Sequence, residues 1–242
     1  MRFIAAGDTA VVVEFGGRID RALSARVLQL ARQVRAAPPA GVIEVVPTFR
    51  SLLVHYDPLA TSGKNVVASL RALTASGGDK GRPRRRWIIP ACYAPELAPD
   101  LAEVAERTGL GADEVVARHA RTLFHVYMIG FSPGHPYMGD LPAELALPRR
   151  NDPRLRVPAG SIAIASTLSV IHPAENPSGW HVIGATPIRL FDACWERPSL
   201  LAPGDAVRFD PIGLPEYEAI RTAASAGTYL PVGEEIESWP RG

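Results

Sequence analysis

The stretch from Gly130 to Asp192 constrains the fold of this chain more than any other segment. It holds many of the glycines and prolines, three of the six histidines, and the aromatic residues Tyr137 and Trp180. Two runs in which apolar and polar residues alternate, Ser161–Ile171 and His181–Phe191, lie within it. Short alternating strands separated by Gly/Pro turns are typical of barrels and sandwiches, whose loops often carry binding sites. The sequence therefore predicts a β-rich domain whose binding rim is built from this stretch.

Composition and charge are those of an ordinary globular protein. Hydrophobic residues make up 47% and charged residues 21% of the 242 residues, and the formal net charge is +1. This balance gives no reason to expect nucleic acid or an anionic membrane as a partner. The N-terminus lacks the pattern of a signal peptide, and no apolar run approaches the ~18 residues of a membrane span. Cys92 and Cys194 are too few for a disulfide framework or a metal knuckle, so we expect a cytoplasmic protein.

Residues 1–80 predict a small N-terminal α/β sandwich domain. Asp20 is placed to cap an amphipathic helix that Pro38 ends. The order strand–strand–helix–strand–strand–helix is that of an α+β sandwich. The expected elements are a hairpin over 3–15, a helix after Asp20, strands over 42–46 and 51–56, and a helix with Val66, Val67, Leu70 and Leu73 on one face.

The glycine-rich, basic segment Ser76–Arg86 is the best candidate for a linker between domains. Its arginines either form a phosphate-binding patch or, as is commoner, are simply solvated. We place the domain boundary between residues 80 and 81.

Residues 81–242 predict a closed or nearly closed β-barrel with peripheral helices. Besides the two runs named above, the expected elements are strands over 87–90, 122–129 and 206–210 and helices over 101–108 and 112–121. The last 30 residues mix turns with small residues.

Gly130-Phe-Ser-Pro-Gly134 matches the G-x-S-x-G pattern of a hydrolase nucleophile elbow but lacks its mechanics. In that elbow a helix follows the serine directly, and the backbone N–H of the next residue helps to form the oxyanion hole. Here the next residue is Pro133, which has no N–H, and turn residues follow it. We therefore do not expect Ser132 to be a nucleophile.

The histidines show none of the tight spacings that predict a metal site. We expect His119, His125 and His181 to be hydrogen-bonded packing residues. His135 and His172 differ because each lies in a turn beside a proline within the predicted rim, where it either contacts a ligand or packs. No Gly-rich phosphate-binding motif is found in the sequence.

Arginines and aromatic residues in the same stretch allow two interpretations each. The arginines are Arg149, Arg150, Arg154 and Arg156. Guanidinium groups in a turn often hold a carboxylate or phosphate, but these could equally be solvated and pair locally with Asp152. Tyr137 and Trp180 are either the aromatic floor of a pocket or core anchors of the barrel.

A series of motifs, taken together, matches a known family. In chain order they are Pro47-Thr-x-Arg-Ser51, Val54-x-Tyr-Asp57, Cys92-Tyr93 before Pro99-Asp-Leu, Gly130-Phe-x-Pro-Gly-x-Pro-Tyr-x-Gly139, Pro148-Arg-Arg, Arg156-Val-Pro-Ala-Gly-Ser161, and Gly179-Trp-x-x-Ile-Gly-x-Thr-Pro187 with Leu190-Phe-Asp192. In these segments the chain closely resembles the KipI family, whose members are the B-type subunits of 5-oxoprolinase and the first subunits of allophanate hydrolase. The resemblance spans nearly the whole chain.

The resemblance implies an N-terminal α+β domain and a C-terminal cyclophilin-like β-barrel. It also implies a partner of the KipA type, the C-type subunit. With a LamB/YcsF-type protein as the A-type subunit, such a pair opens the lactam 5-oxoproline to glutamate at the expense of ATP, and the chain alone would be inactive. One branch of the family inhibits a sporulation histidine kinase, so a non-catalytic binding protein is the alternative.

For the enzyme hypothesis, the resemblance and the predicted rim together nominate a site without a metal. His135 and His172 are the candidate catalytic residues, which would polarise the substrate or transfer a proton. The candidate substrate-binding residues are Arg50, Phe131, Tyr137, Arg149, Ser161 and Trp180.

The chain departs from the family pattern at positions that bear on the substrate. Leu168 stands where a side-chain amide is usual, Val170 where a glycine is usual, and Ala185 in the place of a frequent arginine. His135 replaces a common phenylalanine, and His172 a common tyrosine. We expect the segment around Leu168 and Val170, with Ala185, to determine the substrate.

Overall fold

The computed structural model describes residues 1–75 and 84–236, and the chain divides into two compact units, Met1–Pro83 and Arg84–Gly242. Each unit has a hydrophobic core of its own. The domain boundary predicted between residues 80 and 81 lies outside the described residues. The predicted linker ran too far, because residues 84–86 already belong to a strand.

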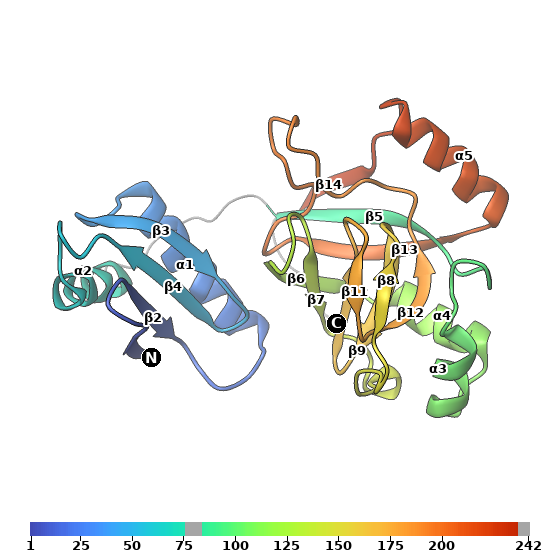
Figure 1. The fold of residues 1–242 in the computed structure, drawn as a ribbon, viewed down its shortest axis with the longest axis horizontal. Helices are drawn as coiled ribbons and strands as arrows, with labels where there is room; N and C mark the ends of the chain where they lie inside the picture. Colours follow the sequence, from blue (N-terminus) through green and yellow to red (C-terminus); the bar gives the residue numbers. More distant parts are fainter. Residues whose placement is uncertain (76–83, 237–242) are drawn as a thin grey trace. The chain divides into compact units, whose positions relative to one another are not determined.

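The N-terminal domain packs two helices against one face of a four-stranded antiparallel sheet (Figure 1). The strand order is β1-β2-β4-β3. The elements are β1 (Arg2–Ala5), β2 (Ala10–Glu14), α1 (Arg21–Ala36), β3 (Val42–Pro47), β4 (Ser51–Tyr56) and α2 (Gly63–Ala75). Their order confirms the predicted α+β sandwich.

Helix α1 shows how local sequence fixes these elements. The Asp20 side chain accepts hydrogen bonds from the backbone N–H groups two and three residues later (2.9 and 3.0 Å), which satisfies donors that the helix leaves unpaired. Val27, Leu30 and Val34 share one face and are fully buried against the sheet. The helix ends before Pro38, as predicted.

The C-terminal domain is a closed β-barrel. Its strands are β5 (Arg84–Cys92), β6 (Phe124–Ile129), β7 (Pro136–Gly139), β9 (Ser161–Ala165), β10 (Leu168–Ile171), β12 (His181–Ala185) and β13 (Ala206–Ile212). They neighbour one another in the order β12-β9-β10-β7-β6-β13-β5, and pairing of Ala185 with Cys92 joins β12 to β5 and closes the ring. Only β5 and β13 run parallel. The predicted run Ser161–Ile171 is thus a hairpin of two strands.

Helices lie around the barrel, and two of them have the predicted bounds. These are α3 (Leu101–Thr108) and α4 (Ala112–Arg121), and a short 3₁₀ helix, η1 (Ala143–Leu145), follows later. Gly109 ends α3 in the left-handed conformation, with a φ of 69°. Within residues 1–75 and 84–236, no helix has the length and apolar character needed to cross a membrane.

No helix or strand is predicted in the last 30 residues, which are expected to mix turns with small residues, and the structure differs there. They contain α5 (Leu214–Ser225) and β14 (Val232–Ile236), which pairs with β5 outside the ring. Helix α5 buries only Tyr217, so it carries little of the apolar pattern that reveals a helix. Strand β14 is Val-Gly-Glu-Glu-Ile and owes its extended form to pairing with β5.

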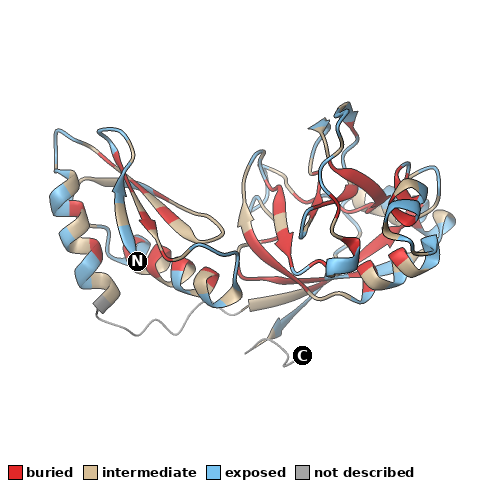
Figure 2. Cartoon of the chain, turned by 90° about the horizontal axis from the view of Figure 1, so that it is seen from below, coloured by how far each residue is buried: buried red, intermediate tan, exposed pale blue. Residues whose placement is uncertain are grey.

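Most residues of the barrel strands are buried, as their red colour in Figure 2 shows, so side chains on both faces of the strands are buried. The interior holds one set of alternate residues, among them Phe124, Val126, Met138, Ile162, Ile164, Ile171 and Ile183. A two-stranded ribbon of β8 (Arg154–Val157) and β11 (Asn176–Ser178) lies outside the ring (Figure 1). Between the ribbon and the strands lies an outer cluster of Val157, Ala163, Ala165, Val170, Trp180 and Val182, with Tyr137 and Leu168 packed against it.

Candidate functional site

Three predicted site residues, His135, His172 and Ser161, lie in one row on the outer face of the barrel. Val170 of β10 pairs with Tyr137 of β7, so two residues further along the same ladder His172 lies opposite His135. On the other side of β10, the backbone N–H of His172 donates to the carbonyl of Ser161 at 2.9 Å. Residues two apart share a face of a strand, so the row lies on the face of the outer cluster. All three are buried.

The loop between β6 and β7 carries His135 and is shaped by a tight turn. The N–H of His135 donates to the carbonyl of Ser132 at 3.1 Å, with Pro133 and Gly134 between them. Gly134 has a φ of +75°, as the third residue of a type II turn requires. Strand β7 follows directly, which confirms that no helix follows Ser132. Phe131 is held at a φ of +72° with its ring exposed, a strained backbone of the kind found at ligand sites.

A chain of ring contacts links this loop to the ribbon. The ring centroids of Phe131 and His135 are 5.5 Å apart, and those of His135 and His172 are 5.1 Å apart. His135 also lies 5.1 Å from Tyr137, whose ring is 6.1 Å from that of Trp180. The rings meet edge-on or tilted, which are the favourable arrangements for aromatic pairs. The structure therefore brings these five predicted residues together.

Both histidines of the row are neutral at physiological pH. Burial, together with the nearby His172, lowers the pKa of His135 to about 4. Burial also lowers the pKa of His172, against the effect of a hydrogen bond between its Nδ1 and Asn176 Oδ1 (2.8 Å). Nδ1 of His135 and Nε2 of His172 are buried and have no hydrogen-bond partner in the part of the chain that the structure describes. Buried polar atoms are nearly always satisfied, so these two nitrogens indicate a place where a ligand or water binds.

Arg149 supplies positive charge at the edge of this site. Its guanidinium carbon lies 5.7 Å from the centre of the Trp180 ring. Burial raises the pKa of Tyr137, and the positive charge of Arg149 offsets part of that rise. None of the described carboxylates pairs with Arg149. It is therefore suited to the predicted role of holding a carboxylate or a phosphate.

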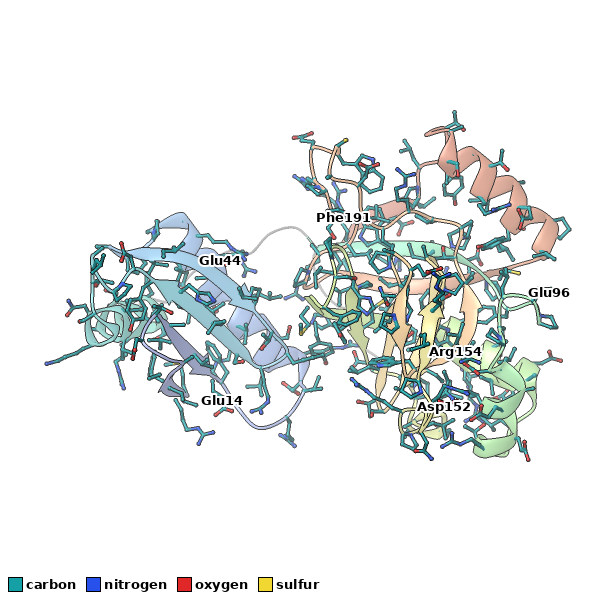
Figure 3. The ribbon with its side chains drawn as sticks, in the orientation of Figure 1. Glu14, Glu44, Glu96, Asp152, Arg154 and Phe191 are labelled. Atoms are coloured by element: carbon teal, nitrogen blue, oxygen red, sulfur yellow. The ribbon has the colours of Figure 1, made fainter. Side chains whose placement is uncertain are left out.

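Arg150 and Arg154 serve the fold instead of a ligand. Arg150 donates to the carboxylate of Asp100 at 2.8 Å, and Arg154 donates to both oxygens of the same group at 2.6 Å each. Asp100 is 1% exposed and also accepts from the backbone N–H of Val182 at 2.7 Å. Figure 3 labels Arg154, and Asp152 just before it in the chain. For these two arginines the hydrogen-bonded carboxylate is that of Asp100 and not the nearby Asp152, whose charge acts on Arg154 only as a smaller effect.

The hydrogen bonds around Asp100, the Asp100 network, hold the β8–β11 ribbon and the adjacent Trp180 in place. Arg154 is the first residue of β8, and the N–H of Arg150 donates to the carbonyl of Gly179 at 2.7 Å, next to Trp180. Arg150 also donates to Glu103 of α3 at 2.7 Å. Sequence reasoning did not assign a role to Asp100, although the motif Pro99-Asp-Leu pointed to it.

Among the other histidines of the barrel, His119 and His181 are hydrogen-bonded packing residues, as predicted, and His125 is a buried residue of the barrel wall. His119 is fully buried, with Nδ1 2.9 Å from the Tyr93 hydroxyl and Nε2 3.0 Å from the Ser169 hydroxyl, and burial lowers its pKa to about 3. His181 bonds a backbone carbonyl through Nε2 (3.0 Å), and His125 is buried in β6. No group of three or more His, Cys, Asp or Glu side chains among the described residues is placed to hold a metal ion.

The departures from the family pattern fall in two places. Leu168 and Val170 belong to the outer cluster beside Tyr137, so an apolar surface adjoins the histidine row. Ala185 instead packs in a separate small cluster with Tyr217 of α5.

Arg50, the remaining predicted residue, belongs to the N-terminal domain (its partner Glu14 is labelled in Figure 3). Its guanidinium donates to the Glu14 carboxylate and to the carbonyl of Gly16, each at 2.6 Å. A contribution of Arg50 to ligand binding stays a prediction.

Comparison with known proteins defines the class of protein to which this fold and site belong. A family model described as "Carboxyltransferase domain, subdomain C and D" matches residues 1–201. The crystal structure of K. lactis urea amidolyase has the same fold over 97% of this chain and 16% of its own, with a TM-score of 0.81 and 22% identity. The molecule is a carboxyltransferase-domain protein.

Closer relatives specify the family. The B subunit of 5-oxoprolinase from Bacillus subtilis (strain 168) is 34% identical over 226 residues, which cover 89% of this chain and 94% of the relative. The solved structure of TTHA0988 is 35% identical with a TM-score of 0.75 over 84% of this chain, which spans only 40% of that longer chain. This chain belongs to the KipI family of 5-oxoprolinase B subunits, as the sequence motifs predicted.

Proposed function

We propose that the chain is the B-type subunit of an ATP-dependent 5-oxoprolinase and acts only with its partners. These are a KipA-type protein as the C-type subunit, together with a LamB/YcsF-type protein as the A-type subunit. The observation that carries the proposal is the match to a 5-oxoprolinase B subunit over almost the whole of both chains. The chemistry of the histidine row agrees with it.

A lactam that bears a carboxylate suits the residues of the site. Arg149, which has no carboxylate partner among the described residues, would hold the substrate carboxylate. Tyr137 and Trp180 would flank the small ring, and the apolar neighbours Leu168 and Val170 would exclude water from one side. The unpartnered nitrogens of His135 and His172 would contact the amide.

Opening of the lactam is a hydrolysis. The oxygen of water bonds to the carbonyl carbon, the C–N bond breaks, and the ring nitrogen takes up a proton. The lowered pKa values of His135 and His172 keep both imidazoles unprotonated at pH 7, so each ring has one nitrogen with a lone pair that can accept a hydrogen bond or a proton. We assign them to the polarisation of the amide and to these proton transfers.

The residues of this site do not fit a triphosphate. Arg150 and Arg154 are engaged by Asp100, which leaves Arg149 as the cation at the edge of the ring cluster. A nucleotide triphosphate usually requires a cradle of backbone N–H groups together with a cation. We therefore assign the use of ATP to the complex and not to the residues of this site.

Co-expression with the two partner proteins tests the proposal. The assembled complex is expected to convert 5-oxoproline to glutamate with ATP consumption, whereas the chain alone is not. Arg149→Ala should raise the KM for 5-oxoproline by about 10- to 100-fold, the effect of losing one charge-assisted contact. Arg156→Ala is the matched control, because Arg156 is exposed and pairs with Glu175. A purified complex of all three proteins without turnover of 5-oxoproline would refute the assignment.

A further inference from the structure

Asn176 links His172 to the backbone in a way that determines which ring nitrogen carries the proton. His172 follows β10, and Asn176 is the first residue of β11. His172 Nδ1 lies 2.8 Å from Asn176 Oδ1. On its other side, Asn176 Nδ2 donates to the carbonyl oxygen of Ala174 at 3.0 Å.

The carbonyl of Ala174 sets the orientation of the amide. A carbonyl oxygen only accepts hydrogen bonds, so the amide atom that faces it must be the NH₂ group. The amide oxygen of Asn176 therefore faces His172 and can only accept. It follows that Nδ1 of His172 carries the hydrogen. In a neutral imidazole the second nitrogen, Nε2, then holds a free lone pair.

That lone pair is buried and has no partner within the described ranges of the chain. The centroid of the His172 ring lies 5.1 Å from that of His135, whose Nδ1 is also buried and has no partner there. His172 is 2% exposed, so bulk solvent does not satisfy the nitrogen. A buried acceptor of this kind is satisfied when a ligand or a water molecule brings an N–H or O–H group to it.

We propose that Asn176 is a positioning residue that holds His172 as the Nδ1–H tautomer, so that Nε2 accepts a hydrogen bond from a small ligand with an N–H donor. The ligand class is a small molecule with an uncharged amide or lactam group whose N–H is free. Naming 5-oxoproline as that ligand rests on the proposed function, whereas the tautomer does not. His172 can offer an unprotonated Nε2 to a ligand only when its hydrogen is held on Nδ1 by an acceptor, and Asn176 supplies that acceptor.

Side-chain ¹⁵N NMR of the full chain tests the tautomer without any ligand. The two ring nitrogens of a neutral histidine have well-separated shifts, and His172→Gln identifies the His172 signals by their loss. The wild-type chain should show a protonated Nδ1 and a bare Nε2 at His172. Asn176→Leu should shift His172 to the Nε2–H form, because it removes the acceptor opposite Nδ1. Asn176→Asp, which keeps an acceptor there, should retain the Nδ1–H form.

Two controls separate positioning from unfolding. Asn151→Leu removes an exposed amide elsewhere and should leave the His172 signals unchanged. The signals of the core residue His119, which bonds Tyr93 and Ser169, should stay in place in every variant that folds. A wild-type His172 with its hydrogen on Nε2 would overturn the proposal, and so would an unchanged tautomer in a folded Asn176→Leu chain.

The assembled complex provides a second measurement that distinguishes the two proposals. Asn176→Leu should lower kcat/KM for 5-oxoproline about tenfold, and Asn176→Asp should recover most of it, since one buried hydrogen bond to the ligand is at stake. If the complex does not use 5-oxoproline, the proposed function fails while the NMR result still decides the role of Asn176. Equal activity of wild type and Asn176→Leu in a complex that does turn over would count against the positioning role.

Discussion

Replacement of Asp100 by alanine should destabilise the C-terminal domain far more than loss of any surface ion pair. The buried carboxylate accepts from Arg150, from both terminal nitrogens of Arg154, and from the backbone N–H of Val182. Removing one partner of a buried ion pair costs about 3–5 kcal/mol. Arg150 would keep Glu103 at 2.7 Å, and the Arg154 side chain is 31% exposed, so water replaces part of the loss. We therefore expect Asp100→Ala to lower the free energy of unfolding by an amount at the low end of this range, about 3 kcal/mol.

Tryptophan fluorescence during urea unfolding measures this cost in the correct domain. All four tryptophans of the chain lie after residue 84, so the N-terminal domain contributes no tryptophan emission. With a slope of about 2 kcal/mol per molar urea, the midpoint should fall by about 1.5 M. Arg107→Ala is the control, because it breaks only the exposed Glu103–Arg107 pair and should cost about 0.3–0.5 kcal/mol. A cost below about 1 kcal/mol for Asp100→Ala would refute the structural role of the network.

Three further predictions concern the loop and the histidine row. Gly134→Ala should lower the free energy of unfolding by about 2 kcal/mol or more, because the new Cβ would lie 2.6 Å from that of Phe191 and the backbone there is left-handed. The control Gly109→Ala, at a left-handed glycine with open space around it, should cost only about 1 kcal/mol. Equal costs of the two substitutions in urea titrations would contradict this prediction. The pKa of His135 falls from 6.5 to about 4 on folding, so stability present above pH 6.5 is lost as the pH falls towards 4. His135→Phe should reduce that slope by up to about 1.4 kcal/mol per pH unit, and an unchanged slope would argue against a neutral buried imidazole. Phe131→Gly should keep the free energy of unfolding within about 1 kcal/mol of wild type yet raise the KM of the complex; an unaltered KM would remove Phe131 from the site.

Local sequence predicted the fold wherever an element is stabilised by its own residues. Asp20 and Pro38 bound α1, and Gly109 ends α3, because caps and breakers act over a few residues. The failures are elements that depend on distant pairing. Strand β14 has two adjacent glutamates and is extended because it pairs with β5, and α5 buries only Tyr217.

The candidate site was predictable by residue type but not by arrangement. His135 and His172 stood out because both lie in turns beside prolines. Their contact depends on pairing between β7 and β10, strands that are not consecutive in the chain, so local patterns do not define their register. The same limit explains Arg150 and Arg154: nearby Asp152 was the obvious partner, whereas the actual partner, Asp100, lies about 50 residues upstream.

Under the proposed function, a small lactam binds on the histidine row beside Trp180. The most direct test incorporates 5-fluorotryptophan into this chain, assembles it with its partner proteins, and follows the ¹⁹F signals as 5-oxoproline is added. The Trp180 signal, assigned by its loss in Trp180→Phe, should shift with a saturating dependence on concentration. The signal of Trp87, whose indole N–H is held by Asp205 in the barrel core, should stay fixed. A Trp180 signal that does not move at concentrations that saturate turnover would contradict the account.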